Sequence, residues 1–303
     1  MALDVHGRVL TALITPFDGD GRVDLGVAAD LARSLAARGS DGFVVAGTTG
    51  EAPTLSAEEK LDLCRAVRRA VDGRASVWLN AGSYDTAESA RLAAEAQDSG
   101  ADGVMAVVPY YNRPPQRGLQ LHFAAIAKAT PLPVMVYNVP ARTGTNLLPA
   151  TLAALVDEAP NVTACKEASR DLEQVAEICR LLPPSAGFRV YSGDDGLTLP
   201  VMAVGGAGVV SVASHIVPER VAEVVRCCAT GEWERARAVH LALLPLVRAL
   251  FCTTNPIPVK VALRMCGFPA GGFRPPLCEP GEAERQTILR GLEAQGLLGA
   301  LRA

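Results

Sequence analysis

Short apolar runs rich in β-branched residues alternate with longer stretches of helical period along the first 230 residues of the chain. Runs of this length and composition, separated by helical segments, are typical of β/α units that build a parallel sheet. The apolar runs predict eight strands, at residues 9–14, 42–45, 77–79, 103–108, 134–137, 162–165, 188–191 and 209–212.

The stretches between these runs place apolar residues on one helical face. They predict helices at residues 24–38, 57–72, 86–99, 119–129, 149–158, 172–182, 196–204 and 218–229. Eight strands, each followed by a helix, favour a closed eight-stranded β/α barrel, a TIM barrel of the α/β class, over an open doubly wound sheet.

Two helix starts carry capping signals. Ser56 is followed three residues later by Glu59, which is the pattern of a capping box. Thr86 precedes a helical stretch that contains Glu88, so its hydroxyl is expected to cap that helix.

The strand signal ends near residue 230. Beyond it, residues 232–251, 256–266 and 280–298 all have helical period. We therefore divide the chain into a β/α barrel over residues 1–230 and a C-terminal helical region over residues 231–303, whose apolar face is expected to pack on the barrel.

The formal charge of −3 is spread along the chain, and no basic run alternates with aromatic residues. Nucleic acid is therefore not an expected partner. No apolar stretch reaches the roughly 18 residues of a membrane span, and residues 1–11 lack the pattern of a signal peptide, so a cytoplasmic protein without membrane contact is expected. The eight cysteines include no C-x-x-C pair and are expected to be free thiols, and no cluster of metal-ligating residues predicts a metal site.

In a barrel of this kind the active site lies at the carboxyl ends of the strands. Five predicted strands lead into reactive or turn-forming residues there: Gly47–Glu51, Pro109–Asn112, Tyr137–Pro140, Cys165–Glu167 and Ser192–Asp195. These segments are expected to meet on one rim of the barrel.

Lys166 is the candidate nucleophile at this rim. The chain has only four lysines among its 29 basic residues, and this one alone follows an apolar run at a strand end. Desolvation lowers the pKa of a buried lysine, and its neutral amine can then attack a carbonyl and form an imine. A structural ion pair with Glu167 or Asp194 is the alternative, and the position of the lysine leaves both open.

Two tyrosines and one turn complete the candidate chemistry. Tyr137 and Tyr111 follow strands on the same rim, where a phenol can transfer the protons that imine chemistry requires, although aromatic packing is an equally ordinary role. The Gly47-Thr48-Thr49-Gly50 turn offers backbone N–H groups and two hydroxyls, which suit a small carboxylate.

In order and spacing, seven segments resemble those of the dihydrodipicolinate synthase family of pyruvate-dependent class I aldolases. They are GTTGE at 47–51, PYYNRP at 109–114, YNVPARTG at 137–144, CKEA at 165–168, SGDD at 192–195, GVVSVASH at 208–215 and NPIPVK at 255–260. The resemblance covers nearly the whole chain, from the LITPF segment at residues 13–17 to the C-terminal helices.

The resemblance implies that pyruvate forms an imine with Lys166, becomes an enamine and attacks aspartate β-semialdehyde, giving 4-hydroxy-tetrahydrodipicolinate in lysine and diaminopimelate biosynthesis. It implies no cofactor. Tyr137 is then the proton donor and acceptor, linked through Thr49 to Tyr111, which comes from the neighbouring subunit of a tight dimer. The family's usual assembly is a homotetramer.

The resemblance also implies the substrate contacts. Thr48 and Thr49 hold the pyruvate carboxylate, Gly193 and the backbone of Val210 line the pyruvate pocket, and Arg142 receives the carboxylate of the semialdehyde. A guanidinium suits that role because it binds a carboxylate through two parallel hydrogen bonds.

Two other functions stay open. One is a related pyruvate aldolase or dehydratase, of the sialic acid lyase or keto-deoxy sugar acid type, with a different acceptor. The other is a barrel that binds a carboxylate without catalysis. Three positions depart from the family's common pattern: Asn80 replaces a glycine, Ala52 a serine, and Cys165 a small or branched apolar residue.

Overall fold

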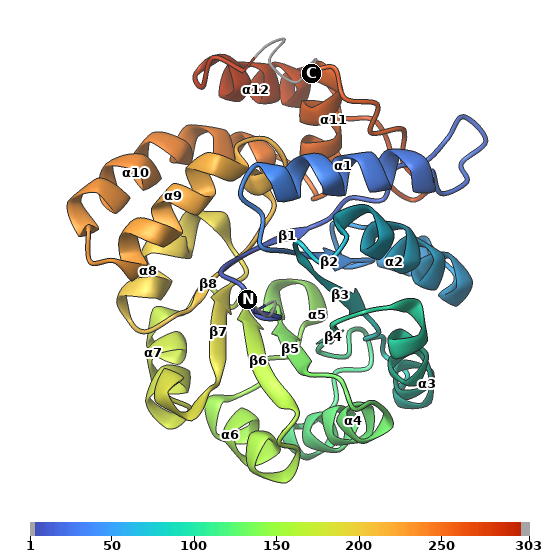
Figure 1. Ribbon diagram of the computed structural model, residues 1–303, viewed down its shortest axis with the longest axis vertical. Coiled ribbons are helices and arrows are strands. Elements are labelled where there is room, and N and C mark those ends of the chain that lie inside the picture. Colours follow the sequence, from blue (N-terminus) through green and yellow to red (C-terminus); the bar gives the residue numbers. More distant parts are fainter. Residues whose placement is uncertain (1–3, 298–303) are drawn as a thin grey trace.

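The computed structural model describes residues 4–297 and contains a closed barrel of eight parallel strands in sequence order (Figure 1). Strand β1 closes the barrel by pairing with both β2 and β8. The strands are β1 (Val9–Ala12), β2 (Gly42–Val45), β3 (Ser76–Asn80), β4 (Gly103–Val107), β5 (Val134–Asn138), β6 (Val162–Glu167), β7 (Arg189–Ser192) and β8 (Gly208–Ser211). The predicted TIM barrel is confirmed.

Helices surround the barrel on its outside (Figure 1). They are α1 (Leu25–Ala37), α2 (Ala57–Val71), α3 (Thr86–Ala96), α4 (Gln116–Ala129), α6 (Pro149–Glu158), α7 (Leu172–Leu181), α8 (Thr198–Ala203) and α9 (Pro218–Ala229). A further short helix, α5 (Pro140–Thr143), follows β5 and was not predicted. With only four residues it is too short to show an apolar period.

One of the two predicted caps is present. In the capping box of α2, the Ser56 hydroxyl accepts from the Glu59 N–H, and the Glu59 carboxylate accepts from the Ser56 N–H. The Thr86 prediction is wrong: Asp85 caps α3 by accepting from the Glu88 N–H at 2.9 Å, while the Thr86 hydroxyl bonds to His122. Both residue types favour the cap position, and the helix begins at Thr86, one residue earlier than a cap at Thr86 requires.

Two apolar cores stabilise the barrel. The larger lies between the strands and the surrounding helices, and the smaller fills the barrel interior. Trp78, Met105 and Met135 belong to the interior core. The barrel is therefore packed, and its chemistry is confined to its ends.

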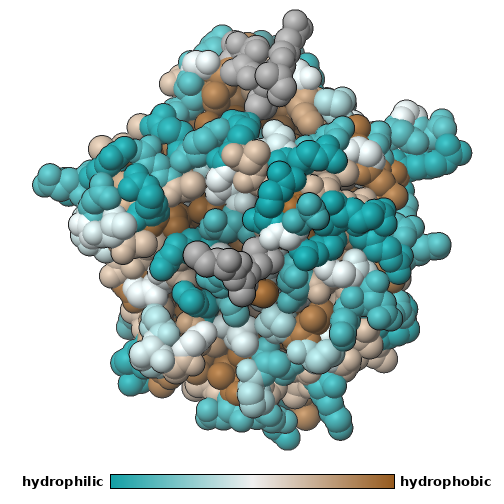
Figure 2. Space-filling model, in the orientation of Figure 1, coloured by the Kyte–Doolittle hydropathy of each residue, from teal (hydrophilic) through white to brown (hydrophobic). Residues whose placement is uncertain are grey.

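The N-terminal segment crosses the end of the barrel opposite the predicted rim. The Trp78 indole donates to the Val5 carbonyl at 3.0 Å, and the Tyr191 hydroxyl donates to the His6 carbonyl at 2.6 Å. Figure 2 shows this face with hydrophobic residues scattered among hydrophilic ones.

Three helices follow the barrel: α10 (Trp233–Leu250), α11 (Ile257–Met265) and α12 (Glu282–Glu293). Helix α10 packs against α9, and α12 packs against α10 and α11. Helix α12 ends at Glu293, short of the predicted end at residue 298, which itself lies outside the described residues. The division at residue 230 stays a prediction. Within residues 4–297, no helix is long and apolar enough to cross a membrane.

A buried ion pair joins α11 to the barrel. The Lys260 side chain is 0% exposed, and its ammonium donates to the Glu51 carboxylate at 2.8 Å and to the Thr15 carbonyl at 2.9 Å. The second Glu51 oxygen accepts from the backbone N–H of Arg274 at 3.1 Å. Both charges are buried, so removing either one leaves the other uncompensated and destabilises the fold.

We predict that Lys260→Met lowers the free energy of unfolding by about 3 to 5 kcal/mol, because Glu51 is left as an uncompensated buried charge. Chemical denaturation measures the change. Arg264→Met is the matched control on the same helix: it removes an exposed pair with Glu279 and should cost less than about 1 kcal/mol. Equal losses in the two variants would contradict the prediction.

Candidate active site

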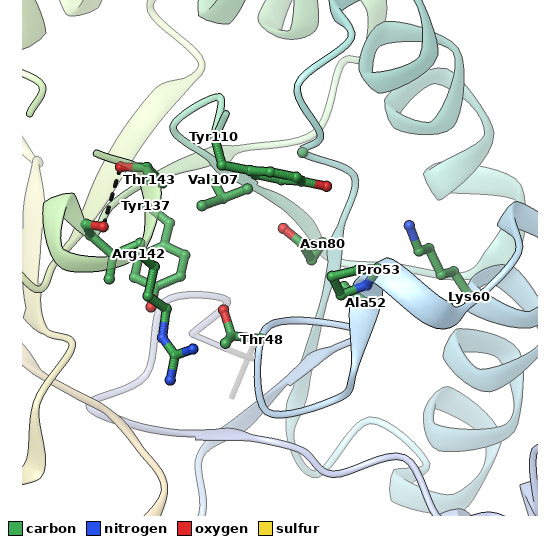
Figure 3. A pocket seen from close by; sticks show the side chains of 12 residues that line it. Thr48, Ala52, Pro53, Lys60, Asn80, Val107, Tyr110, Tyr137, Arg142 and Thr143 are labelled. Atoms are coloured by element: carbon green, nitrogen blue, oxygen red, sulfur yellow. Dashed lines mark hydrogen bonds between the residues drawn. The ribbon is translucent and has the colours of Figure 1, made fainter. Parts of the chain in front are cut away.

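A cavity of about 220 Å³ opens at the carboxyl end of the barrel. Figure 3 shows Thr48, Tyr137 and Arg142 together on one side, while Lys60 lies beyond Ala52 and Pro53. The lining residues come from strand ends and from the loops that follow them: Thr48, Ala52, Pro53, Lys60, Asn80, Gly82, Val107, Tyr110, Tyr137, Val139, Arg142 and Thr143.

Lys166 lies inside strand β6, in register with Tyr137 of β5. Its side chain is 5% exposed, and its Nζ lies 4.1 Å from the centroid of the Tyr137 ring. Burial lowers the pKa of Lys166 from 10.5 to about 7, the Asp195 carboxylate opposes this fall, and the Arg142 charge adds to it. A large fraction of the amine is therefore neutral and nucleophilic near neutral pH.

The ion-pair alternative for Lys166 does not match the structure. Glu167, which points to the other face of β6, accepts from the side chains of Asn138 and Gln174 at 3.0 and 3.1 Å. Asp194 pairs with Arg170 at 3.1 Å. Glu167 faces away from Lys166 because consecutive strand residues face opposite sides of the sheet. Asp194 lies beyond the end of β7, where Arg170 is its partner.

Tyr137 is buried beside the lysine. Burial raises the pKa of its phenol, while the Arg142 charge and a hydrogen-bond contribution from the Thr48 side chain oppose the rise. The phenol therefore stays protonated at neutral pH and has a proton to donate.

The structure favours Thr48 over Thr49 as the threonine beside Tyr137. The Thr48 side chain counteracts the rise in the pKa of the Tyr137 phenol, and Thr48 lines the cavity. Thr49 is buried on the other side of the turn, where its hydroxyl accepts from the Asn255 amide at 2.9 Å. Adjacent residues of a tight turn point in different directions, which the sequence alone cannot assign.

The turn that carries both threonines is strained. Ala46 before it has φ 53° and Glu51 after it has φ 56°, both in the left-handed region. Non-glycine residues there cost on the order of 1 to 3 kcal/mol each and persist only where the surroundings enforce them. Turns that direct successive backbone N–H groups to one side form anion-binding sites, which is the role expected of this turn.

Gly193 lies beside Lys166, and Val210 lies in the barrel interior. A Cβ at Gly193 would lie 2.7 Å from the Ala168 Cβ and 3.3 Å from the Lys166 Cε, so only glycine fits. Val210 belongs to the barrel-interior core together with Tyr137.

Arg142 lies in the short helix α5 and is exposed at the mouth of the cavity. Tyr111 does not join the other candidate residues within this chain. Its side chain is 93% exposed, and its backbone has φ 71°, an unusual conformation for an aromatic residue.

Three residues near the site escaped the sequence prediction. Lys60 lines the cavity, so Lys166 is not the only lysine near this rim. Asp195 is the carboxylate that opposes the fall in the Lys166 pKa, whereas its neighbour Asp194 had been the candidate partner. Asn255 reaches Thr49 across 206 residues of sequence. Two of the three lie in segments that the sequence analysis marked, Asp195 in SGDD and Asn255 in NPIPVK, but neither segment showed which side chain faces the site.

Comparison with known proteins agrees with this geometry. The model of the dihydrodipicolinate synthetase family matches residues 5–295. The 4-hydroxy-tetrahydrodipicolinate synthase of Moorella thermoacetica is 52% identical over 292 residues, which cover 96% of this chain and 99% of that protein.

Two solved structures have the same fold. DHDPS from Cyanidioschyzon merolae, with lysine bound, is 46% identical, has a TM-score of 0.94, and is matched over 96% of this chain and 99% of that chain. The chloride-inhibited dihydrodipicolinate synthase from Acinetobacter baumannii, complexed with pyruvate, is 35% identical with a TM-score of 0.92 and the same coverage. The chain belongs to the dihydrodipicolinate synthetase family.

Proposed function

We propose that this chain condenses pyruvate with aspartate β-semialdehyde, through an imine on Lys166, to give 4-hydroxy-tetrahydrodipicolinate. The observation that carries the proposal is the burial of the Lys166 amine against Tyr137, with a pKa near 7 and no carboxylate in an ion pair with it among residues 4–297. The name of the relative from Moorella thermoacetica, 52% identical, supports the same reaction.

The first half of the reaction uses pyruvate alone. The neutral Lys166 amine attacks the keto carbon, and the keto oxygen leaves as water with protons passed through Tyr137. The N–H groups of the strained turn and the Thr48 and Thr49 residues hold the pyruvate carboxylate. Loss of a methyl proton then converts the imine into an enamine.

The second half joins the aldehyde. The enamine carbon attacks the aldehyde carbon of the semialdehyde, and the resulting alkoxide takes a proton. The amino group of the former semialdehyde then attacks the imine carbon and displaces Lys166, which closes the ring. Arg142 at the cavity mouth is placed to receive the carboxylate of this second substrate.

We assign the proton link between Tyr137 and Tyr111 to Thr48, whose side chain interacts with Tyr137. Tyr111 is proposed to complete the site of a partner subunit, because its exposed ring and left-handed backbone project it away from its own cavity. The tight dimer, a homotetramer built from it and a cytoplasmic location belong to the same proposal.

Removal of the nucleophile tests the imine. Lys166→Ala should abolish the covalent adduct that borohydride traps from pyruvate, measured by mass spectrometry. Lys60→Met, which removes the lysine that lines the cavity, should leave trapping intact. In the unmodified enzyme, trapping should rise with pH to about 7 and then level off, because only the neutral amine reacts and its pKa lies there. A rate that rises toward pH 10 would show an unperturbed lysine.

Loss of the guanidinium tests the second substrate. Arg142→Ala should raise the KM of the semialdehyde by roughly 10- to 150-fold, the effect of losing a charge-assisted pair worth about 1.5 to 3 kcal/mol. The KM of pyruvate should change far less. Arg117→Ala, which removes an exposed charge on α4, serves as control. Equal increases for both substrates would contradict the assignment.

Subunit mixing tests the role of Tyr111. Lys166→Ala and Tyr111→Phe chains should each have little activity alone. Random exchange makes half of the dimers mixed, and one of the two sites in each is then complete, so about a quarter of the unmodified activity should return. Native mass spectrometry monitors the exchange. If exchange occurs without recovery, Tyr111 acts within its own chain.

A further inference from the structure

The Gly47–Glu51 turn is contacted by the C-terminal region on the side away from the cavity. Asn255, between α10 and α11, donates from its amide to the Thr49 hydroxyl at 2.9 Å, and both side chains are buried, at 7% and 2% exposure. The Thr49 side chain therefore ties the turn to a segment that lies outside the barrel strands.

A second attachment lies at the end of the same turn. Lys260 and the Arg274 N–H hold the Glu51 carboxylate, as described above, and the Thr15 hydroxyl donates to the Gly50 carbonyl at 2.7 Å. Because Lys260 also binds the Thr15 carbonyl, one ammonium joins the turn, strand β1's exit and α11. Asn255 and Lys260 thus act from one short segment of the chain.

The conformation of the turn explains why it needs such support. Ala46 and Glu51 are both left-handed at its ends, and a turn so strained relaxes unless its surroundings enforce it. When only a fraction of molecules has the binding-competent conformation, the apparent dissociation constant of the ligand rises by the inverse of that fraction. The contacts of the turn with Asn255 and Lys260 therefore affect how tightly the turn binds a ligand on its cavity side.

We propose that Asn255 is a positioning residue for the first substrate: through Thr49 it holds the turn in the conformation that binds the pyruvate carboxylate. Lys260 supports the same segment through Glu51. The inference rests on the proposed function, because it assumes that pyruvate is the ligand of the turn. It assigns a role to the C-terminal helical region beyond packing.

The test replaces the amide by an apolar group. The Asn255 Oδ1 has no hydrogen-bond partner within residues 4–297, so Asn255→Leu removes an unsatisfied acceptor together with the hydrogen bond and need not destabilise the fold. Asn255→Ala is the smaller alternative. We expect the KM of pyruvate to rise about two- to tenfold, the effect of one neutral hydrogen bond, while kcat at saturating pyruvate stays within about twofold.

The matched control is Asn161→Leu. Asn161 donates to the Ala127 and Thr130 carbonyls at the other end of the barrel, so its loss should lower the thermal unfolding temperature without changing the KM of pyruvate. A second comparison uses Thr49→Val, which removes the acceptor. Adding Asn255→Leu to Thr49→Val should change the KM of pyruvate less than about 1.5-fold, because Asn255 acts through that hydroxyl.

The effect on pyruvate binding can be measured without the second substrate. Exchange of the pyruvate methyl protons in D₂O, followed by NMR, requires the enamine alone, and its dependence on pyruvate concentration should shift as KM does. An unmodified enzyme that exchanges no methyl protons would reject the proposed function. An active enzyme whose pyruvate dependence is unchanged by Asn255→Leu, or altered equally by Asn161→Leu, would reject the inference.

Discussion

Exclusion of water from the Lys166 amine governs the arrangement of the groups around it. The barrel interior leaves this side chain 5% exposed and lowers its pKa to about 7. A carboxylate in direct contact would restore the charge and remove the nucleophile. The neighbouring carboxylates are accordingly turned to other partners, Glu167 to two amides and Asp194 to Arg170. Asp195 acts only through its field, while its oxygens accept from the Val212 and Ala213 N–H groups.

The same burial explains the position of Tyr137. Neighbouring parallel strands in register place Tyr137 beside Lys166, so a proton donor accompanies the amine without a flexible loop. Thr48 and Arg142 then complete one side of the cavity from the ends of β2 and β5 (Figure 3). Two adjacent strands set the distance between Lys166 and Tyr137, which favours catalysis by orientation.

The C-terminal helices contribute more than packing area. Lys260 and Glu51 form a fully buried pair, and Asn255 reaches Thr49, so a segment over 200 residues from the turn contacts it at both threonine and glutamate. The strained turn conformation persists because these contacts restrain it. The barrel supplies the turn, and the C-terminal region keeps it in its unusual conformation.

Hydrophobic period and strand-end position were enough to predict the barrel, its eight helical connections, and Lys166 and Tyr137 as rim residues, because both signals are local and repeat regularly. Side-chain direction in turns and helices has no such period. It decided which threonine lies beside Tyr137, which aspartate affects the pKa of Lys166, and that Lys60 lines the cavity. The partners of Asn255 and Lys260 could not be predicted from local patterns, because those partners are distant in sequence. The sequence by itself determined which strands bear the chemistry, and the tertiary structure alone decided which side chains face one another, because burial and direction are properties of the packed chain.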